Sequence, residues 1–293
     1  MSLRITPLID PERALSWHRL AWLASASGGA PAGAAFLRLF TTPGQRHLAE
    51  LQLDVHPAER RAGVGSGLLE RAVTAARDDG RRCVIAQADP GSPGQGFLAA
   101  RGFREVLTLV HSRLPLAEAD PAALTAIAGR PHAGYRLTEW DGTVPDDRAA
   151  AFAASRSAMD DMPVGDTDYG TVDWDVDRVR AAGEAIARRG DLLHTIAVVD
   201  ESDGALAGFT ELVVPGNGTS DGQHYGTGVL PGHRGRGLGL WMKAASILHA
   251  RRRHPRLSGL LTDTAEENAP MLAINGALGY VLTHTVVQYQ LDL

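Results

Sequence analysis

The chain has 293 residues, of which 44% are hydrophobic and 22% are charged, and its formal net charge is −5 at pH 7. This length suits two domains that each bury a core, and the composition is that of a soluble globular protein. The negative charge argues against nucleic acid as a partner. No apolar run could span a bilayer and no signal-peptide pattern opens the chain, so we expect a cytoplasmic protein without membrane association.

Two residue types occur only once. Cys83 lies in an apolar run, which predicts a buried core residue and excludes an internal disulfide. Lys243 is the only lysine, so nearly all positive charge is arginine. Such a bias is typical of G+C-rich bacterial coding sequences, and the arginine count therefore carries no phosphate-binding meaning by itself.

The first half of the chain is predicted to form one α/β unit. Apolar groups at Leu15, Leu20 and Leu23 indicate an amphipathic helix over residues 12–26. The elements expected after it are strands over 34–40 and 47–55, a helix through 68–76, a strand over 83–88, a short helix over 97–100 and a closing strand over 106–114. Residues 116–131 are alanine-rich and bounded by prolines, which indicates a linker with a short helix.

The second half is predicted to follow the same order with two helices before its central strands, where the first half has one. Its expected elements are a strand over 135–140, helices over 146–159 and 176–188, a hairpin over 193–199 and 205–213, a strand over 224–230, a helix after the next loop, a strand over 259–264, a helix from 268 and a final strand pair over 281–291.

The loop between the strand and helix of the second half reads V-L-P-G-H-R-G-R-G-L-G from Val229 to Gly239. Its glycines permit positive φ angles and a close approach of the backbone, and the following helix presents its positive dipole end. Successive backbone N–H groups can therefore converge on a pyrophosphate, each charge-assisted hydrogen bond contributing about 1.5–3 kcal/mol. The sequence predicts an anion site that needs no metal.

The same loop pattern occurs twice. V-x-P-x-x-R-x-x-G-x-G begins at Val55 and again at Val229, an offset of 174 residues. A second pair of landmarks, Gly102-Phe103 and Gly279-Tyr280, has an offset of 177. Two landmarks with nearly one offset indicate an internal duplication.

These motifs resemble the GNAT acetyltransferase superfamily. The loop is similar to that family's acyl-CoA pyrophosphate loop, and N-x-x-M-x-x-x-N-x-x-L-G-Y from Asn268 to Tyr280 is similar to its fourth helix. The resemblance implies two tandem α/β (α+β) domains, each with a mixed, mostly antiparallel twisted sheet flanked by helices. We expect a degenerate domain over residues 1–116, a linker over 117–133 and a catalytic domain over 134–293, in a monomer or homodimer.

The resemblance also implies acetyl-CoA as co-substrate, with no metal. The strand that leads into the loop would bind the pantetheine arm and the thioester through its backbone. The residues assigned to CoA on this basis are Gly228, Val229, Leu230, Arg234, Gly235, Arg236, Gly237, Leu238, Gly239, Leu240 and Asn268, with Val55, Arg60, Gly63 and Gly65 as a second candidate site.

The implied reaction is attack of an amine on the thioester carbonyl, for which a base is useful. Some family members carry bases six or four residues before the valine, where this chain has Gln223 and Tyr225. His224 and the mid-strand Glu211 are further candidates, and a structural histidine and an exposed glutamate are the alternatives for them. Asn275 stands where many members have a tyrosine proton donor, and its amide can donate a hydrogen bond but not a proton.

Aspartates are concentrated between Met159 and Val179. The resemblance places this segment beside the acceptor, so Asp160, Asp161, Asp166 and Asp168 are candidates for an anionic entrance, and solvated loop aspartates are the alternative. The sequence thus predicts an N-acetyltransferase that acts on a small, cationic primary amine in a ternary complex. A non-catalytic acyl-CoA-binding or sensor protein stays open, as does a mycothiol-synthase-like or antibiotic-modifying acetyltransferase.

Overall fold

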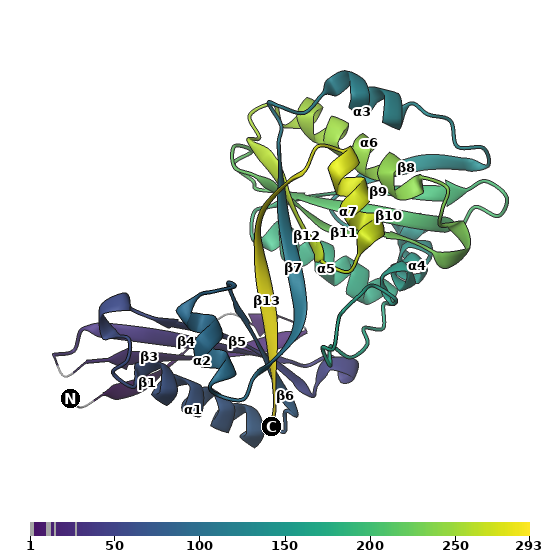
Figure 1. Ribbon diagram of the computed structural model, residues 1–293. Helices are drawn as coiled ribbons and strands as arrows, with labels where there is room; N and C mark the ends of the chain where they lie inside the picture. The colour runs from purple at the N-terminus through teal and green to yellow at the C-terminus, as the bar shows by residue number, and fades with distance from the viewer. Residues whose placement is uncertain (1–2, 10–12, 15, 27) are drawn as a thin grey trace. The chain divides into compact units, whose positions relative to one another are not determined.

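The computed structural model describes residues 3–9, 13–14, 16–26 and 28–293 (Figure 1). The chain divides into two compact units, and neither is continuous in sequence. The first unit contains the described residues of Met1–Thr108 together with Val164–Asp173 and Thr285–Leu293. The second contains Leu109–Pro163 and Trp174–His284, so residues 117–133, expected as a linker, belong to it.

The first unit is a twisted sheet with two helices. Its strands lie in the order β1 (Arg4–Leu8), β3 (Trp17–Ser25), β4 (Pro31–Phe40), β5 (Leu48–Val55), β6 (Cys83–Ala88) and the end of β13 (Val281–Asp292), and the two-residue β2 (Arg13–Ala14) pairs with β3. Only the β5–β6 pair is parallel among these described pairs. Helix α1 (Val64–Asp78) packs Leu68 and Ala72 into the core, and α2 (Pro93–Ala99) adds Leu98.

The helix predicted over residues 12–26 is wrong. Glu12 and Leu15 lie outside the described residues, but residues 17–25 form β3, which pairs with β1 on one side and β4 on the other. Leu20 lies opposite Leu37 in this pairing, and Trp22 lies opposite Ala35. An inner strand has both edges hydrogen-bonded, and this long-range pairing overrides the weak helical spacing of a few leucines.

The strand expected to close each half closes the other one instead. Residues 109–115 of β7 (Arg104–Pro115) pair antiparallel with β12 (Gly259–Ala265) inside the second unit. Residues 287–292 of β13 pair antiparallel with β6 inside the first unit. Two similar halves offer the same sheet edge, so an exchange of their last strands satisfies the same backbone groups. The predicted final strand pair over 281–291 is accordingly one long strand.

The second unit follows the predicted order more closely. Its strands lie in the order β7, β12, β11 (Gly222–Val229), β10 (Leu206–Val214), β9 (Leu192–Asp200) and β8 (Tyr135–Asp141), and its helices are α3 (Pro121–Ala128), α4 (Asp146–Ser155), α5 (Val176–Arg188), α6 (Leu238–Arg253) and α7 (Ala269–Ala277). The helix expected over 146–159 ends at Ser155, and Arg156–Met159 continue as a 3₁₀ helix, η3. The predicted fold class is confirmed for both units.

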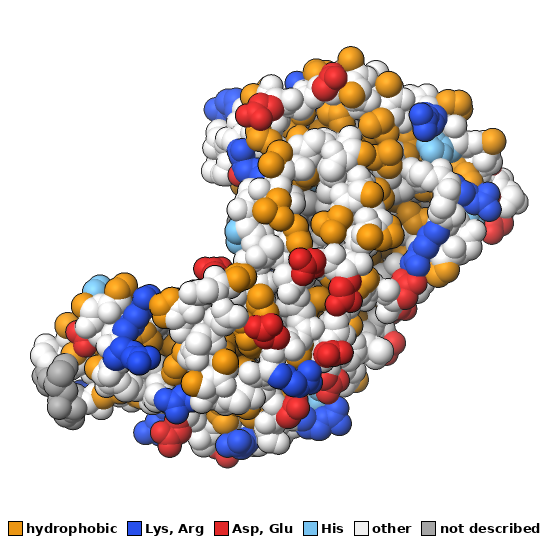
Figure 2. Space-filling model, viewed as in Figure 1, with side chains coloured by type: hydrophobic (Ala, Val, Ile, Leu, Met, Phe, Trp, Pro, Cys, Tyr) orange, Lys and Arg blue, Asp and Glu red, His pale blue; other side chains and the backbone are white. Residues whose placement is uncertain are grey.

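Helix α6 lies at the centre of the second unit. It buries Met242, Ala244 and Ile247 completely, which places its N-terminus in a fixed position against the sheet. Burial of each large aliphatic side chain contributes about 1.5–3 kcal/mol. Figure 2 shows hydrophobic side chains gathered on the face of this unit that carries α3, α6 and α7. Among the described residues, none of the helices combines the length and the apolar character that a membrane span requires.

Candidate active site

The loop between β11 and α6 has the geometry of an anion cradle. Gly235 and Gly237 adopt φ angles of 75° and 77°, which L side chains rarely adopt. Gly237 is the N-cap of α6, and no side chain caps this helix end. The first N–H groups of α6 therefore keep their hydrogen-bonding capacity for a ligand. Gly239 completes the packing, because a Cβ there would lie 3.2 Å from Cδ1 of Ile274 on α7.

The first unit repeats this backbone. Gly63 has φ 86° and caps α1 without a side-chain hydrogen bond, and a Cβ at Gly65 would lie 3.4 Å from the Phe97 ring on α2. Arg61, with φ 64°, holds the left-handed position that Gly235 holds in the second loop. A bulky residue is strained there, so the duplicated loop keeps its shape at some cost in stability.

Arg234 fastens the second loop to its surroundings. Its Nε donates to the carbonyl of Val229 at 2.8 Å, and its guanidinium makes a bidentate pair with Asp161 at 2.5 and 2.7 Å. The pair holds the pKa of the Asp161 carboxyl below its ordinary value. The Arg234 side chain thus supports the loop from the η3 side, and its carboxylate partner carries no free charge.

A cavity of about 580 Å³ opens beside the loop. It is lined by Ile127, Arg130, Pro131, His132, Ala133, Tyr135, Gly235, Arg236, Gly237, Leu240 and Trp241. Nδ1–H of His132 donates a hydrogen bond to the carbonyl of Arg236 at 3.1 Å, and the His132 ring stacks on Trp241 with centroids 4.3 Å apart. Two guanidinium-bearing residues, Arg130 and Arg236, suit a phosphate-bearing ligand.

Sequence reasoning missed the part of this cavity that follows α3. Arg130, His132 and Tyr135 come from a stretch interpreted as a linker or as the start of a strand. Their spacing has no fixed relation to the loop about a hundred residues later, which they reach only through the packing of α3 on α6. Only a structure brings them together.

The strands next to the loop separate as they approach it. β11 and β12 pair in parallel only at Gly222 with Leu260 and at Gln223 with Leu261. The rest of β11 keeps its antiparallel pairing with β10, up to Val229 opposite Gly208. The β12-facing edge of residues 224–229 is therefore available to an extended ligand, which could continue the backbone hydrogen bonding of the sheet.

The comparisons with known proteins show the family. Residues 5–103 and 159–280 match the family model of the acetyltransferase (GNAT) family, and each matched segment contains one copy of the loop. The chain belongs to the GNAT acetyltransferase family. It is an N-acetyltransferase with two tandem GNAT domains, and members of this family use acetyl-CoA as co-substrate.

Similar curated proteins are named mycothiol acetyltransferase. The one from Nocardioides sp. is 28% identical over 293 residues, covering 96% of this chain and 86% of that protein. The one from Clavibacter michiganensis subsp. michiganensis is 32% identical over 248 residues, covering 82% and 72%. A solved tandem GNAT protein from the clavulanic acid biosynthesis pathway has a TM-score of 0.76 and 27% identity, covering 96% of this chain and 84% of that chain.

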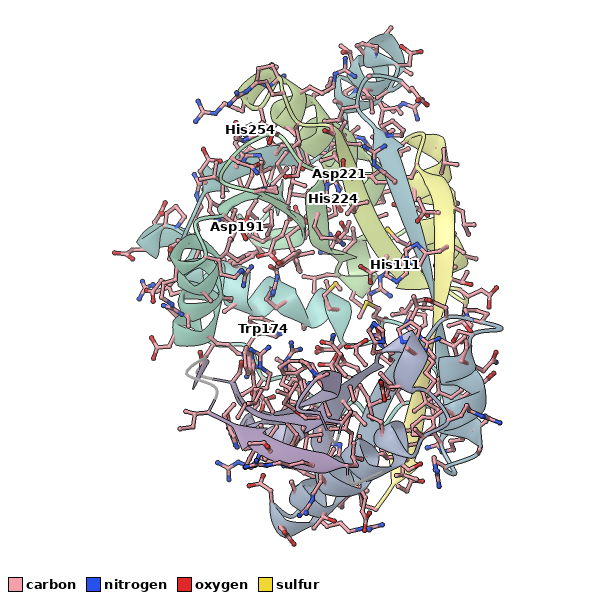
Figure 3. All side chains as sticks on the ribbon, turned by 90° about the vertical axis from the view of Figure 1, so that its left-hand side faces the viewer. His111, Trp174, Asp191, Asp221, His224 and His254 are labelled. Carbon is pink, nitrogen blue, oxygen red and sulfur yellow. The ribbon has the colours of Figure 1, made fainter. Side chains whose placement is uncertain are left out.

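His224 lies in a buried polar cluster of this GNAT fold, beneath the point where β11 and β12 separate. Figure 3 labels His224 among the side chains of the second unit. Nδ1 of His224 is 2.8 Å from the hydroxyl of Tyr280, and its Nε2 is 3.3 Å from the hydroxyl of Ser246. Burial, and to a smaller extent the nearby charge of Lys243, holds the pKa of His224 well below its ordinary value. Its position and contacts are those of a neutral structural residue and do not suit a base for an incoming amine.

Asn275 belongs to the same buried region. Its Oδ1 accepts a hydrogen bond from Nζ of Lys243 at 2.6 Å, while its Nδ2 is buried and has no hydrogen-bond partner among the described residues. Burial lowers the pKa of Lys243 to about 7, an effect that Asp263 partly offsets. Asn268 caps α7, where its Oδ1 accepts from the backbone N–H of Met271 at 3.2 Å.

Glu211 is buried rather than exposed, and it forms an ion pair with Arg156. The Arg156 guanidinium lies 4.0 Å from the Trp174 ring centre and 4.8 Å from that of Phe209. The carboxylate faces β11, because a Cβ at Gly226 would lie 3.8 Å from its Oε2. Glu211 is therefore a charged group held beside the central strand, with its charge balanced by Arg156.

Tyr225 occupies a β-bulge. Glu211 pairs with Gly226 and Leu212 pairs with His224, so Tyr225 is the extra residue of β11. The bulge interrupts the alternation of side chains along the strand. As a result Tyr225 points outward and is 54% exposed, and its hydroxyl accepts a hydrogen bond from Arg189 at 3.0 Å.

The four aspartates expected at the acceptor entrance are divided between the units. Asp160 and Asp161 lie in the second unit, whereas Asp166 and Asp168 lie in the first. Asp168 is paired there with His47, at 3.1 Å from its Nε2. The second unit carries the Val229–Gly239 loop and the cavity beside it. Of the four aspartates, Asp160 and Asp161 belong to this unit.

Proposed function

We propose that the second unit transfers an acetyl group from acetyl-CoA to the primary amine of a small, cationic acceptor, by direct attack in a ternary complex. The observation that carries this proposal is the cradle itself. An uncapped helix N-terminus follows Gly235 and Gly237 at a cavity that Arg130 and Arg236 line. Backbone dipoles and guanidinium groups together suit a pyrophosphate and a further phosphate.

The pantetheine arm would lie along β11. Its amides can pair with the edge that residues 226–229 expose where β12 turns away, which would place the thioester near the bulge at Tyr225. A backbone N–H of this edge can also polarise the thioester carbonyl, as donors do in an oxyanion hole. Gly228, Val229 and Leu230 remain the residues proposed for this contact.

The acceptor amine must lose a proton before it attacks. An alkylamine with a pKa near 10.4 is about three units from neutrality at pH 7, a cost of roughly 4–5 kcal/mol. Glu211 stands beside the bulge, and Arg156 contacts its Oε2. Because Arg156 balances its charge, we assign to this carboxylate the orientation of the amine as a hydrogen-bond acceptor, with the proton passing through water to solvent. Tyr225 would line the same approach from the solvent side.

The leaving thiolate needs stabilisation. We assign this role to the buried Nδ2–H of Asn275, which can donate a hydrogen bond to the sulfur. Lys243 fixes the orientation of that amide through Oδ1. No side-chain proton is transferred in this scheme, because a thiolate can leave unprotonated and take a proton from water later.

The acceptor class has a second candidate. The curated relatives that cover most of this chain are named mycothiol acetyltransferase, which favours a mycothiol-type acceptor. Asp160, an exposed carboxylate of the second unit, instead favours a polyamine or an aminoglycoside, since such a carboxylate attracts cationic amines. The N-terminal half of the chain, residues 1–116, is proposed to be a degenerate domain, because Gly91 and Leu98 stand where Asn268 and Asn275 stand in the second half.

Free-thiol release from acetyl-CoA across an amine panel tests the function. An N-acetyltransferase of this kind releases one thiol per acetylated amine, with kcat/KM greatest for the preferred acceptor. A protein that is stabilised thermally by acetyl-CoA but releases no thiol with any amine would instead be a non-catalytic acyl-CoA-binding protein. Comparing polyamines, aminoglycosides and a mycothiol precursor amine in the same assay separates the two acceptor classes.

A further inference from the structure

Two histidines and two carboxylates meet in the second unit, outside the lining of the cavity beside the loop. Glu139 and Asp141 lie two residues apart on β8, so their side chains share one face of the sheet. β9 brings His194 opposite Asp141, and α6 contributes His249 from above that face. Three elements of the unit therefore converge on one small volume.

The distances within this cluster suit a tetrahedral metal ion. Nε2 of His194 lies 3.8 Å from Oε2 of Glu139, and Nδ1 of His249 lies 3.8 Å from the same oxygen. One ligand atom from each residue falls within 4.8 Å of the others. An ion with bonds of about 2.0–2.1 Å separates its tetrahedral ligands by about 3.4 Å. Because the lone pair of an imidazole lies in the plane of its ring, binding also requires the His249 ring to tilt out of its parallel stack on His194.

A second observation points to a ligand at this place. His194 is 5% exposed, and Asp141 Oδ1 lies 2.7 Å from its Nδ1. With the proton on Nδ1, the ring presents the lone pair of Nε2 toward Glu139. This Nε2 is buried and has no hydrogen-bond partner among the residues that the structure describes. A carboxylate that orients a histidine in this way is the usual outer partner of a metal-bound imidazole.

His249 is positioned to join the same ion. Its ring lies parallel to that of His194, with centroids 3.4 Å apart and an angle of 7° between the planes. A tilt of this ring directs its Nδ1 toward the point that His194 and Glu139 face.

We propose that Glu139, His194 and His249 bind one Zn²⁺ ion, with water as the fourth ligand and Asp141 as the positioning residue for His194. Two nitrogens and one carboxylate oxygen suit zinc, whereas Mg²⁺ and Ca²⁺ require oxygen ligands. The ion would cross-link β8, β9 and α6, and its role would be structural. Arg253 lies 3.8 Å from the other oxygen of Asp141 and limits the negative charge of the site.

The test is metal binding by the whole, chelator-stripped protein. Calorimetric titration with ZnCl₂ is expected to give one bound ion and a raised melting temperature, and Co²⁺ is expected to give the visible absorption of a tetrahedral site. Asp141→Asn should weaken binding about 10–100-fold, and loss of a direct ligand in His249→Gln should weaken it by about 100-fold or more. Glu139→Gln changes an exposed side chain and keeps the test valid if His249→Gln does not fold.

Two control variants separate this site from others. Glu184→Gln makes the same chemical change at an exposed carboxylate on α5 that pairs with Arg188, and should bind zinc as the native protein does. Cys83→Ser removes the cysteine from the His47, Cys83 and Asp168 group of the first unit, and should also bind normally. Absence of zinc binding by the stripped native protein, or unchanged affinity in Glu139→Gln, would overturn the proposal.

Discussion

Nζ of Lys243, the only lysine of the chain, donates a hydrogen bond to Oδ1 of Asn275 at 2.6 Å inside the second unit. If Asn275 donates to the departing sulfur, Asn275→Asp should keep the contact with Lys243 but remove the N–H donor. We expect kcat to fall about 10²–10³-fold, the usual loss for one transition-state donor. Circular dichroism and acetyl-CoA binding check that the fold and the cofactor site persist. Equal kcat for the two proteins would exclude Asn275 from the chemistry.

The buried lysine also predicts a pH dependence of stability. Its pKa falls from 10.5 to about 7 on folding, so between these values the unfolded state binds more protons than the folded state. The free energy of unfolding should therefore rise with pH in this window, with a slope approaching about 1.36 kcal/mol per unit. Urea denaturation at pH 7.0 to 8.5, roughly below the titration of unfolded cysteine, measures it. Lys243→Met should flatten the slope, and an unchanged slope would contradict this origin.

The paired loops allow a matched comparison of the two units. Gly237→Val places a β-branched residue at a φ of 77°, and Gly63→Val does so at 86°. The first change should abolish the thermal stabilisation by acetyl-CoA, because it distorts the cradle of the second unit. The second should leave turnover close to native if the protein folds. Loss of turnover in folded Gly63→Val, with acetyl-CoA still bound to the second unit, would assign the catalysis to the first.

Local features were predictable from the sequence and long-range ones were not. The positive φ at Gly237 and the start of α6 follow from residues within one turn of each other. The exchange of β7 and β13 depends on which of two equivalent sheet edges each strand joins, and no local sequence pattern distinguishes these edges. The stacking of His132 on Trp241 was missed because these residues are also far apart in the sequence.

The burial of the candidate catalytic side chains could not be predicted from the sequence either. The sequence left both a functional and a structural role possible for Glu211 and His224, because a single sequence does not reveal the partners of a side chain. Arg156, which neutralises Glu211, lies 55 residues away on η3, and Ser246, which contacts His224, lies on α6. Candidate residues within the glycine loop were easier to assign, since there the backbone supplies the chemistry.

The ion pair between Arg156 and Glu211 predicts a large effect on stability. Both side chains are nearly buried, at 12% and 10% exposed, so Glu211→Gln leaves an uncompensated guanidinium among aromatic rings. Breaking such a pair costs about 3–5 kcal/mol, whereas replacing both partners by apolar groups is often nearly neutral. Chemical denaturation should therefore show a large loss in Glu211→Gln and recovery in the double variant Arg156→Met, Glu211→Leu. Equal stability of all three proteins would mean that the pair is solvated.

The division of the aspartates between the units gives a test of the acceptor entrance. If a cationic amine approaches the second unit past Asp160, Asp160→Asn should raise the acceptor KM and leave acetyl-CoA affinity unchanged. The attraction acts through solvent, so kcat/KM of the native protein should fall with salt as the Debye length shortens from about 10 Å at 0.1 M to about 3 Å at 1 M. The variant should be less sensitive to salt. Asp168→Asn is the matched control, since this aspartate belongs to the first unit and is paired with His47. Parallel salt curves for the native protein and Asp160→Asn, or an equal effect of Asp168→Asn, would remove Asp160 from the acceptor path.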